Sequence, residues 1–224
     1  FEADRCVGVV TDTEKYHAPV IIMTVPLPIV QGFFAQSSMP NAVSERIRPY
    51  FDSLGAIRYQ GIISLILKLK RAMTDFYWMN IADSEIPFSV LVEHTNLVSS
   101  DEYQGKHILY MGQYVSPDDP LLQSHPQEIY KKYIPLIKKV IPSLSEDDVE
   151  ASFTFSDPYA TPVYEIGFWK KMPSCETPLP GMFLLNNTQL YPKSRTVDQT
   201  VALADRLTCK ISDKNDSKKT VKVG

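Results

Sequence analysis

Glycine is scarce in this chain of 224 residues, which contains only 9, and nowhere do they form the pattern G-x-G-x-x-G. That turn lets a backbone approach a pyrophosphate closely, so its absence excludes the common dinucleotide-binding motif from this sequence. Cysteine is also scarce: Cys6, Cys175 and Cys209 lie far apart, without metal-ligand spacing. Because an odd number of scattered cysteines favours a reducing compartment, we expect a cytoplasmic protein.

Long apolar runs and an excess of basic charge are missing too. No stretch of about 18 apolar residues predicts a membrane span, and a net charge of -3 argues against a nucleic-acid partner. The four histidines stand alone, without a second histidine or cysteine at i+3 or i+4, so we expect no metal site. The pattern G-x-S-x-G of a serine hydrolase is absent as well. With 44% hydrophobic residues the chain can still bury a sizeable core.

The stretch from Pro180 to Ile211 predicts a strand, a polar loop and an amphipathic helix. Pro180-Gly181 sets a turn, and the apolar run Met182–Leu185 is typical of a strand buried in a parallel sheet. Thr196, followed three residues later by Gln199, is a capping box that starts a helix at Val197. The apolar residues of this helix are Val197, Val201, Ala204, Leu207 and Ile211.

The first N–H groups of that helix lack backbone partners and carry partial positive charge. They can therefore receive a phosphate or an electron-rich ring edge. The alternative is an ordinary connection between a strand and a helix.

The middle of the chain is rich in strand signals. The aromatic or β-branched runs are Ile57–Lys70, Phe76–Ile81, Phe88–Glu93 and His107–Val115. They predict an antiparallel sheet of about four to six strands. Further strands are expected over 150–156 and 161–166.

A helix should cover this sheet. Ser124 and Gln127 form a second capping box, and an apolar stripe follows at helical spacing. The stripe consists of Ile129, Tyr133, Ile134, Ile137 and Ile141.

Before the sheet we expect a hairpin around Thr11–Glu14, followed by a strand over Val20–Val25 that is buried on both faces. Pro26 and Pro28 should end that strand. A short helix over 40–50 should end at Pro49.

Several segments, in order, resemble a known family. They are Arg5–Val10, Ala18–Pro26, Tyr77–Asp83, Glu93–Asn96 and Pro178–Pro192. Together they are similar to the C-terminal half of FAD-dependent oxidoreductases of the amine oxidase, protoporphyrinogen oxidase and phytoene desaturase superfamily, in a largely uncharacterised subgroup.

The resemblance implies an α+β fold: a mostly antiparallel substrate-domain sheet with covering helices, inserted into part of an FAD-binding α/β (Rossmann-like) domain. Residues 1–26 and 171–211 would belong to the FAD-binding domain and residues 27–170 to the substrate-binding domain, with a disordered tail over 212–224. The missing N-terminal FAD-binding half would then be a partner, and this fragment alone would be inactive. Exposed strand edges would favour a homodimer.

The function implied is oxidation of a C–H or C–N bond of a small-molecule substrate by hydride transfer to FAD. One alternative is a flavin-dependent isomerase resembling UDP-galactopyranose mutase. Another is a non-catalytic binding or interaction domain.

The expected cofactor contacts are Asn186, Asn187, Arg195, Thr196, Val197 and Asp198. Glu93 and His94 are the catalytic candidates, since either side chain suits proton transfer. Neighbours in a strand point to opposite faces, so only one of them can face a given cavity. The alternative is a solvated strand end with local side-chain caps.

Aromatic residues of the sheet, together with one amide, could line a substrate cleft. They are Tyr59, Tyr77, Trp78, Asn96, Tyr110 and Tyr114. The alternative is that the aromatic residues are core residues, as in most strands.

Overall fold

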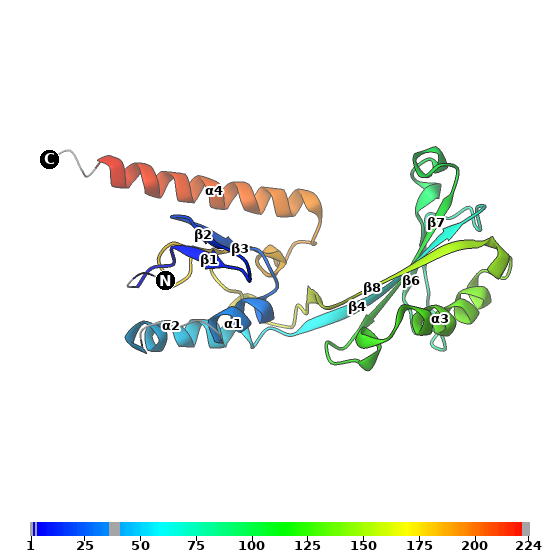
Figure 1. Cartoon of the computed structure of the whole chain (residues 1–224), viewed down its shortest axis with the longest axis horizontal. Helices are drawn as coiled ribbons and strands as arrows, with labels where there is room; N and C mark the ends of the chain where they lie inside the picture. The colour runs from blue at the N-terminus through cyan, green and yellow to red at the C-terminus, as the bar shows by residue number, and fades with distance from the viewer. Residues whose placement is uncertain (1, 3, 36–40, 221–224) are drawn as a thin grey trace. The chain divides into compact units, whose positions relative to one another are not determined.

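The computed structural model describes residue 2, residues 4–35 and residues 41–220. The chain forms two compact units, which are labelled by element in Figure 1. The first unit contains residues 1–58 and 162–224, and the second contains residues 59–161. Helices and antiparallel sheet occur together, which is compatible with the expected α+β class. The division into FAD-binding and substrate-binding parts is functional and stays a prediction.

Two small sheets belong to the first unit. Strands β1 (Gly8–Val10) and β2 (Lys15–His17) form an antiparallel hairpin, closed by the Thr11 N–H donating to Glu14 O at 2.8 Å. The predicted hairpin is therefore confirmed. Strands β3 (Ile21–Met23) and β9 (Met182–Leu184) pair in parallel.

The burial predicted for β3 is wrong, because Ile22 is 38% exposed. A continuous apolar run is compatible with burial on both faces but does not require it. Burial depends on which elements pack on each face, and that is decided by the tertiary structure.

The turn before β9 requires a glycine. Gly181 has φ +84°, and a Cβ there would lie 2.4 Å from Cys6 O. The Cys6 N–H donates to Pro180 O at 2.9 Å and the Ile21 N–H to Gly181 O at 2.8 Å. This close approach explains the residue type, since only glycine combines positive φ with no side chain.

Two helices of the first unit differ from expectation. Helix α1 (Leu27–Ala35), which was not predicted, begins after a three-residue connection from β3. Its first turn contains Pro28, where no backbone N–H is needed. Helix α2 (Asn41–Leu54) continues through Pro49, so the predicted end at this proline is wrong. Ile47, Phe51 and Leu54 of α2 are buried, and this packing offsets the lost hydrogen bond.

The second unit is built on a five-stranded sheet of order β5-β6-β7-β4-β8, which confirms the predicted sheet. The strands are β4 (Tyr59–Leu69), β5 (Trp78–Asn80), β6 (Val90–Glu93), β7 (His107–Val115) and β8 (Val149–Pro162). The β4–β7, β5–β6 and β6–β7 pairings are antiparallel. Strand β8 is continuous where the sequence predicted two separate strands.

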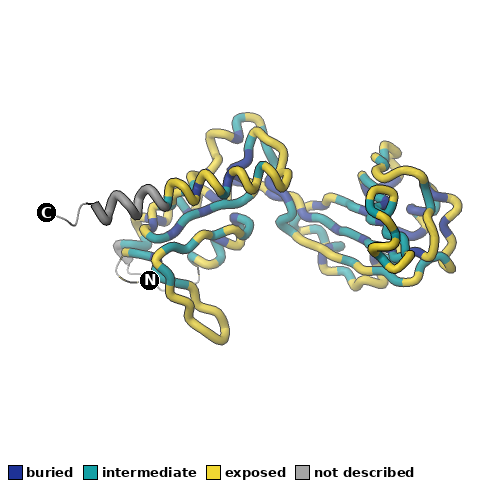
Figure 2. Tube along the Cα trace, turned by 90° about the horizontal axis from the view of Figure 1, so that it is seen from above, coloured by how far each residue is buried: buried dark blue, intermediate teal, exposed yellow. Residues whose placement is uncertain are grey.

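Helix α3 (Pro126–Val140) packs on one face of this sheet. The predicted stripe is confirmed: its members are buried together with the alternate residues Ile63 to Leu69 of β4, and Figure 2 shows the burial along the chain. The capping box is formed by His125 and Glu128 instead of Ser124 and Gln127. The one-residue shift arises because the His125 Nδ1 accepts from the Gln127 N–H at 3.3 Å.

Helix α4 (Val197–Thr220) begins where predicted. Its buried side chains include Leu203 and Leu207, whereas Val197 is 81% exposed and Val201 is also exposed. The predicted apolar stripe is therefore displaced at its start. The helix continues beyond residue 211, and residues 221–224 of the predicted tail lie outside the described part.

Short 3-10 helices connect these elements. They are η1 (His94–Asn96), η2 (Ser100–Tyr103), η3 (Pro120–Gln123), η4 (Glu146–Asp148), η5 (Phe168–Lys170) and η6 (Asn187–Leu190).

Candidate functional site

The junction from β9 through η6 to α4 holds the six expected cofactor residues. Asn186 caps η6, since its Oδ1 accepts from the Thr188 N–H at 3.0 Å and its own N–H donates to Gln189 Oε1 at 2.8 Å. Its Nδ2 donates to Val25 O at 3.1 Å. Asn186 therefore joins the end of β3 to the loop after β9, and most of its hydrogen-bonding capacity is used within the protein.

An aromatic cluster supports this loop. The rings of Tyr164, Phe168 and Tyr191 have centroids 4.8 to 5.3 Å apart, and the Tyr164 hydroxyl donates to Asn187 O at 2.8 Å. The guanidinium of Arg195 lies 5.2 Å from the centroid of the Tyr164 ring, within cation–π range. Its Nη1 donates to Pro162 O at 3.4 Å.

None of these three aromatic residues was predicted from the sequence. No local pattern indicates the cluster, because the three residues lie outside the α-helices and strands and meet only in the tertiary structure. The cluster fixes Arg195 and leaves it exposed. Asn187 is also exposed, so both residues present side-chain donors to solvent.

The first turn of α4 already contains a negative charge. Hydrogen bonds from the side chains of Thr196 and Gln199 hold the pKa of Asp198 below its ordinary value, and the Gln199 amide donates to Asp198 Oδ2 at 3.0 Å. An ionised carboxylate in the first turn satisfies part of the positive helix end. The junction can therefore accept an uncharged polar ring edge more readily than a phosphate.

The second group of predicted residues lies on the sheet. Direct partners in the register share a face, and Tyr114 pairs with Ile62, Tyr110 with Ile66 and Val92, and Trp78 with Val92. Tyr110, Tyr114 and Trp78 therefore lie on the face away from α3, which we call the open face. Trp78 is 55% and Tyr114 49% exposed.

Small residues separate Tyr110 from Tyr114 on the open face. They are Gly112 and its β4 partner Ser64. The Val90 side chain lies beside Gly112, since a Cβ at Gly112 would come within 3.1 Å of Val90 Cγ1.

Two predicted aromatic residues are placed differently. Tyr59 is 8% exposed and has the same strand parity as Ile63, so it lies on the face that α3 covers. Its ring packs edge-on against Tyr159 at 5.9 Å. Tyr77 precedes β5 and its ring lies 6.4 Å from that of Trp78.

Glu93 and Asn96 both bind the segment that precedes β5. Glu93 is fully buried (0% exposed) and accepts from the Met73 and Thr74 N–H groups at 2.8 Å each. Asn96 Nδ2 donates to Thr74 O at 2.8 Å and to Phe76 O at 3.1 Å.

The side chain of His94 lies near the open face. Its Nε2 hydrogen-bonds the Tyr103 hydroxyl at 2.8 Å, and its ring packs edge-on against Tyr110 at 5.9 Å. Within residues 4–35 and 41–220, Nδ1 of His94 has no hydrogen-bond partner. Of the two catalytic candidates, only His94 is therefore placed beside an aromatic residue of the open face.

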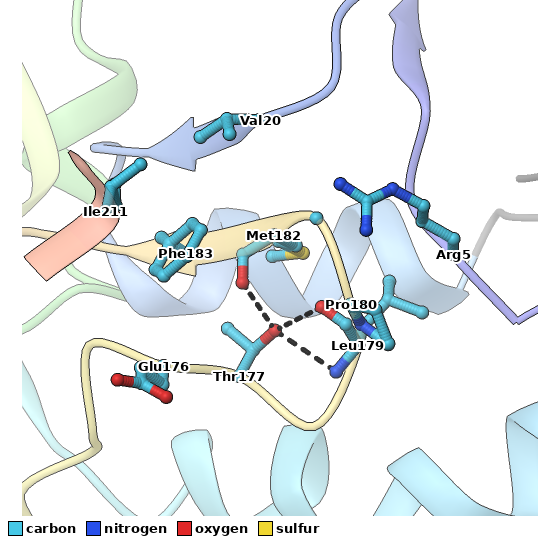
Figure 3. Close-up of a pocket in the computed structure, with 10 residues that line it drawn as sticks. Arg5, Val20, Glu176, Thr177, Leu179, Pro180, Met182, Phe183 and Ile211 are labelled. Carbon is cyan, nitrogen blue, oxygen red and sulfur yellow. Dashed lines mark hydrogen bonds between the residues drawn. The ribbon is translucent and has the colours of Figure 1, made fainter. Parts of the chain in front are cut away.

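A pocket of about 180 Å³ lies elsewhere in the first unit, at the start of β9 (Figure 3). Its apolar lining includes Leu179, Met182, Phe183 and Ile211. Arg5 also lines it, and its Nη2 donates to Pro19 O at 2.6 Å. None of the predicted site residues lines this pocket, so it is not the predicted flavin contact.

Within residues 4–35 and 41–220, no group of three or more His, Cys, Asp or Glu side chains is arranged to hold a metal ion. In the same part of the chain no helix has both the length and the apolar character needed to span a membrane.

Comparison with known proteins gives matches only among solved structures. No family profile matches the chain, and no curated protein sequence matches it. A candidate protoporphyrinogen oxidase from Exiguobacterium sp. 255-15 is similar with a TM-score of 0.62 and 12% identity, over 92% of this chain and 43% of that one. An oxidoreductase from Methanosarcina mazei is similar with a TM-score of 0.58 and 15% identity, over 84% and 42%.

A third similar structure is that of reduced UDP-galactopyranose mutase, with a TM-score of 0.55 and 12% identity over 77% of this chain and 37% of the other. This chain thus spans less than half the length of each of these proteins. At such identities the likeness concerns the fold. The chain therefore has a fold like that of part of these three proteins, as the sequence resemblance led us to expect.

Proposed function

We propose that this chain is part of a flavin-dependent oxidoreductase that oxidises a C–H or C–N bond of a small molecule by hydride transfer to FAD. The observation that carries the proposal is the parallel β3–β9 pair continuing through η6 into the start of α4. It supports the sequence resemblance at the segment expected to contact the flavin. The fold likeness to an oxidoreductase and a candidate protoporphyrinogen oxidase supports it further.

The donors at the junction fit one part of FAD. The Arg195 guanidinium and the Asn187 amide are exposed and would donate to the polar edge of the flavin ring, beside the first N–H groups of α4. The ionised Asp198 opposes a phosphate at the same place. Since the chain has no glycine-rich turn, we place the pyrophosphate contact in a part of the protein outside this sequence.

FAD, when bound, would supply the two-electron acceptor. The chain itself would bind and orient the substrate on the open face, between Tyr110 and Tyr114. Trp78 would close one edge of that face. His94, beside Tyr110, would hold or move a proton at its Nδ1.

A second candidate is a flavin-dependent isomerase without net oxidation. The fold likeness to reduced UDP-galactopyranose mutase favours it. The same junction would then contact the flavin, and the open face would bind a sugar nucleotide.

An absorbance spectrum of the complete protein tests both candidates. We expect flavin bands that bleach anaerobically with a substrate such as benzylamine if the protein is an oxidase or dehydrogenase. An isomerase would leave an oxidised flavin unbleached by UDP-galactopyranose and, after chemical reduction, would convert this sugar nucleotide. A pure, folded protein without flavin bands, even after incubation with FAD, would refute both.

A further inference from the structure

The buried carboxylate of Glu93 and the amide of Asn96 hold the same short segment, residues 73–76. Glu93 Oε1 accepts from the Met73 N–H, and its Oε2 accepts from the Thr74 N–H and, at 2.9 Å, from the Thr74 hydroxyl. Asn96 Nδ2 donates to the carbonyl groups of Thr74 and Phe76. One side chain thus satisfies the donors of the segment and the other satisfies its acceptors.

The residue types match this task. An ionised carboxylate only accepts hydrogen bonds, and two of its partners here are backbone N–H groups. A side-chain amide nitrogen carries two donors, and its two partners are backbone carbonyl groups. Hydrogen bonds to a charged acceptor are stronger than neutral ones, and a buried carboxylate without partners would be costly.

The held segment leads directly into exposed aromatic residues. Phe76, Tyr77 and Trp78 are all exposed, although they are large and apolar. Trp78 begins β5, the edge strand of the sheet, and faces the same side as Tyr110. Trp78 therefore lies two residues beyond the held segment, and its backbone is also paired with Val92 of β6.

We propose that Glu93 and Asn96 form a clamp that positions residues 73–78, and thereby Trp78, at the edge of the open face. Glu93 is a positioning residue and does not transfer protons, because its two oxygens are buried and already accept three hydrogen bonds. The clamp is independent of the proposed function. Only the role of this edge in binding a substrate rests on the proposed function.

The fluorescence of Trp78 reports on the clamp without any ligand. The chain has only two tryptophans, so Trp169→Phe leaves Trp78 as the single emitter. In that background, Glu93→Gln replaces one acceptor oxygen by a donor that faces N–H groups. We expect acrylamide quenching of Trp78 to rise by up to about 1.8-fold, the ratio of full exposure to the present 55%.

Trypsin cleavage after Arg71, two residues before the held segment, gives an independent measurement. The Arg71 guanidinium also donates to Asp148 and to Ser143 O, so cleavage is compared between variants that leave these contacts unchanged. Cleavage of a transiently opened segment follows its opening equilibrium, and the bonds lost are charge-assisted. We expect Glu93→Gln to accelerate this cleavage by about 10-fold or more. The matched control is Glu85→Gln, the same change at an exposed glutamate in the β5–β6 connection, which should alter neither reading.

A second variant separates positioning from loss of folding. Asn96→Asp, at an exposed residue, directs a carboxylate oxygen at two carbonyl groups and should open the same segment while unit 2 stays folded. Leu91→Ala, a cavity in the sheet core, should instead accelerate cleavage at many sites. The proposal is overturned if folded Glu93→Gln and Asn96→Asp both match the parent in quenching and cleavage. If Glu93→Gln does not fold, Asn96→Asp alone decides. Neither reading involves flavin, so either result leaves the flavin proposal to its own test.

Discussion

Replacing Arg195 by glutamate should weaken flavin binding in the complete protein. The substitution removes the guanidinium donor, whose hydrogen bond to the flavin edge would contribute about 0.5 to 1.5 kcal/mol net. It also removes the cation–π contact with Tyr164 at 5.2 Å that holds this donor in place. The new negative charge also lies just before the start of α4, where it would oppose the polar edge of the flavin. Helix-end charges are worth about 0.3 to 1 kcal/mol. Together we expect a loss of about 1 to 2 kcal/mol, or about 5- to 30-fold in Kd.

The flavin Kd can be measured by fluorescence titration of the apoprotein with FAD, and the flavin content after gel filtration gives a second reading. The matched control is Lys193→Glu, which makes the same charge change at an exposed residue two positions earlier and lacks the Tyr164 contact. Equal Kd values for the Arg195→Glu and Lys193→Glu proteins would remove Arg195 from the site. This chain alone should purify without colour, because helix-end effects of about 0.3 to 2 kcal/mol are too small to retain FAD.

Three other predictions concern the sheets. Trp78→Ala should change substrate affinity with little loss of melting temperature, whereas Phe88→Ala, in the core, should cost about 3 to 5 kcal/mol in the free energy of unfolding; equal thermal losses would show that Trp78 is a core residue. Hydrogen bonds from Lys106 and then Lys68 lower the pKa of Glu150 from the ordinary 4.5 to about 2. Because the folded-state pKa is depressed, the stabilising contribution is present above about pH 4.5 and is lost as the pH falls toward 2. A carboxyl NMR titration should show this, and Lys106→Met should raise the pKa of Glu150; an ordinary pKa in the parent protein would contradict the ion-pair geometry. Finally, the edges of the small sheets in the first unit favour self-association of this chain, so light scattering at high micromolar concentration should show a dimer, and a clean monomer would count against it.

Local pattern was enough to predict most elements. The stripe of α3, the long strands β4 and β7 and the start of α4 at Val197 follow from periodicities that depend only on neighbouring residues. The parallel pairing of the Met182 strand was predicted, because a short apolar run is typical of a parallel sheet. Pro49 shows the limit of such rules, since packing of the rest of α2 outweighs the local cost of one proline.

The arrangement of the candidate sites required the tertiary structure. In the sequence, Glu93 is a polar residue at the end of a predicted strand. In the structure its carboxylate is buried and accepts a hydrogen bond from the Met73 N–H, about 20 positions earlier in the chain. Tyr164 supports Arg195 across a gap of about 30 residues. Tyr59 and Tyr110 lie in neighbouring strands of one sheet but on opposite faces. The sequence by itself determined which residues can form helices and strands and which carry donors, acceptors and rings, because these are local properties. Only the tertiary structure decided which of those groups meet, because contacts between distant residues depend on strand register and on the face that each element buries.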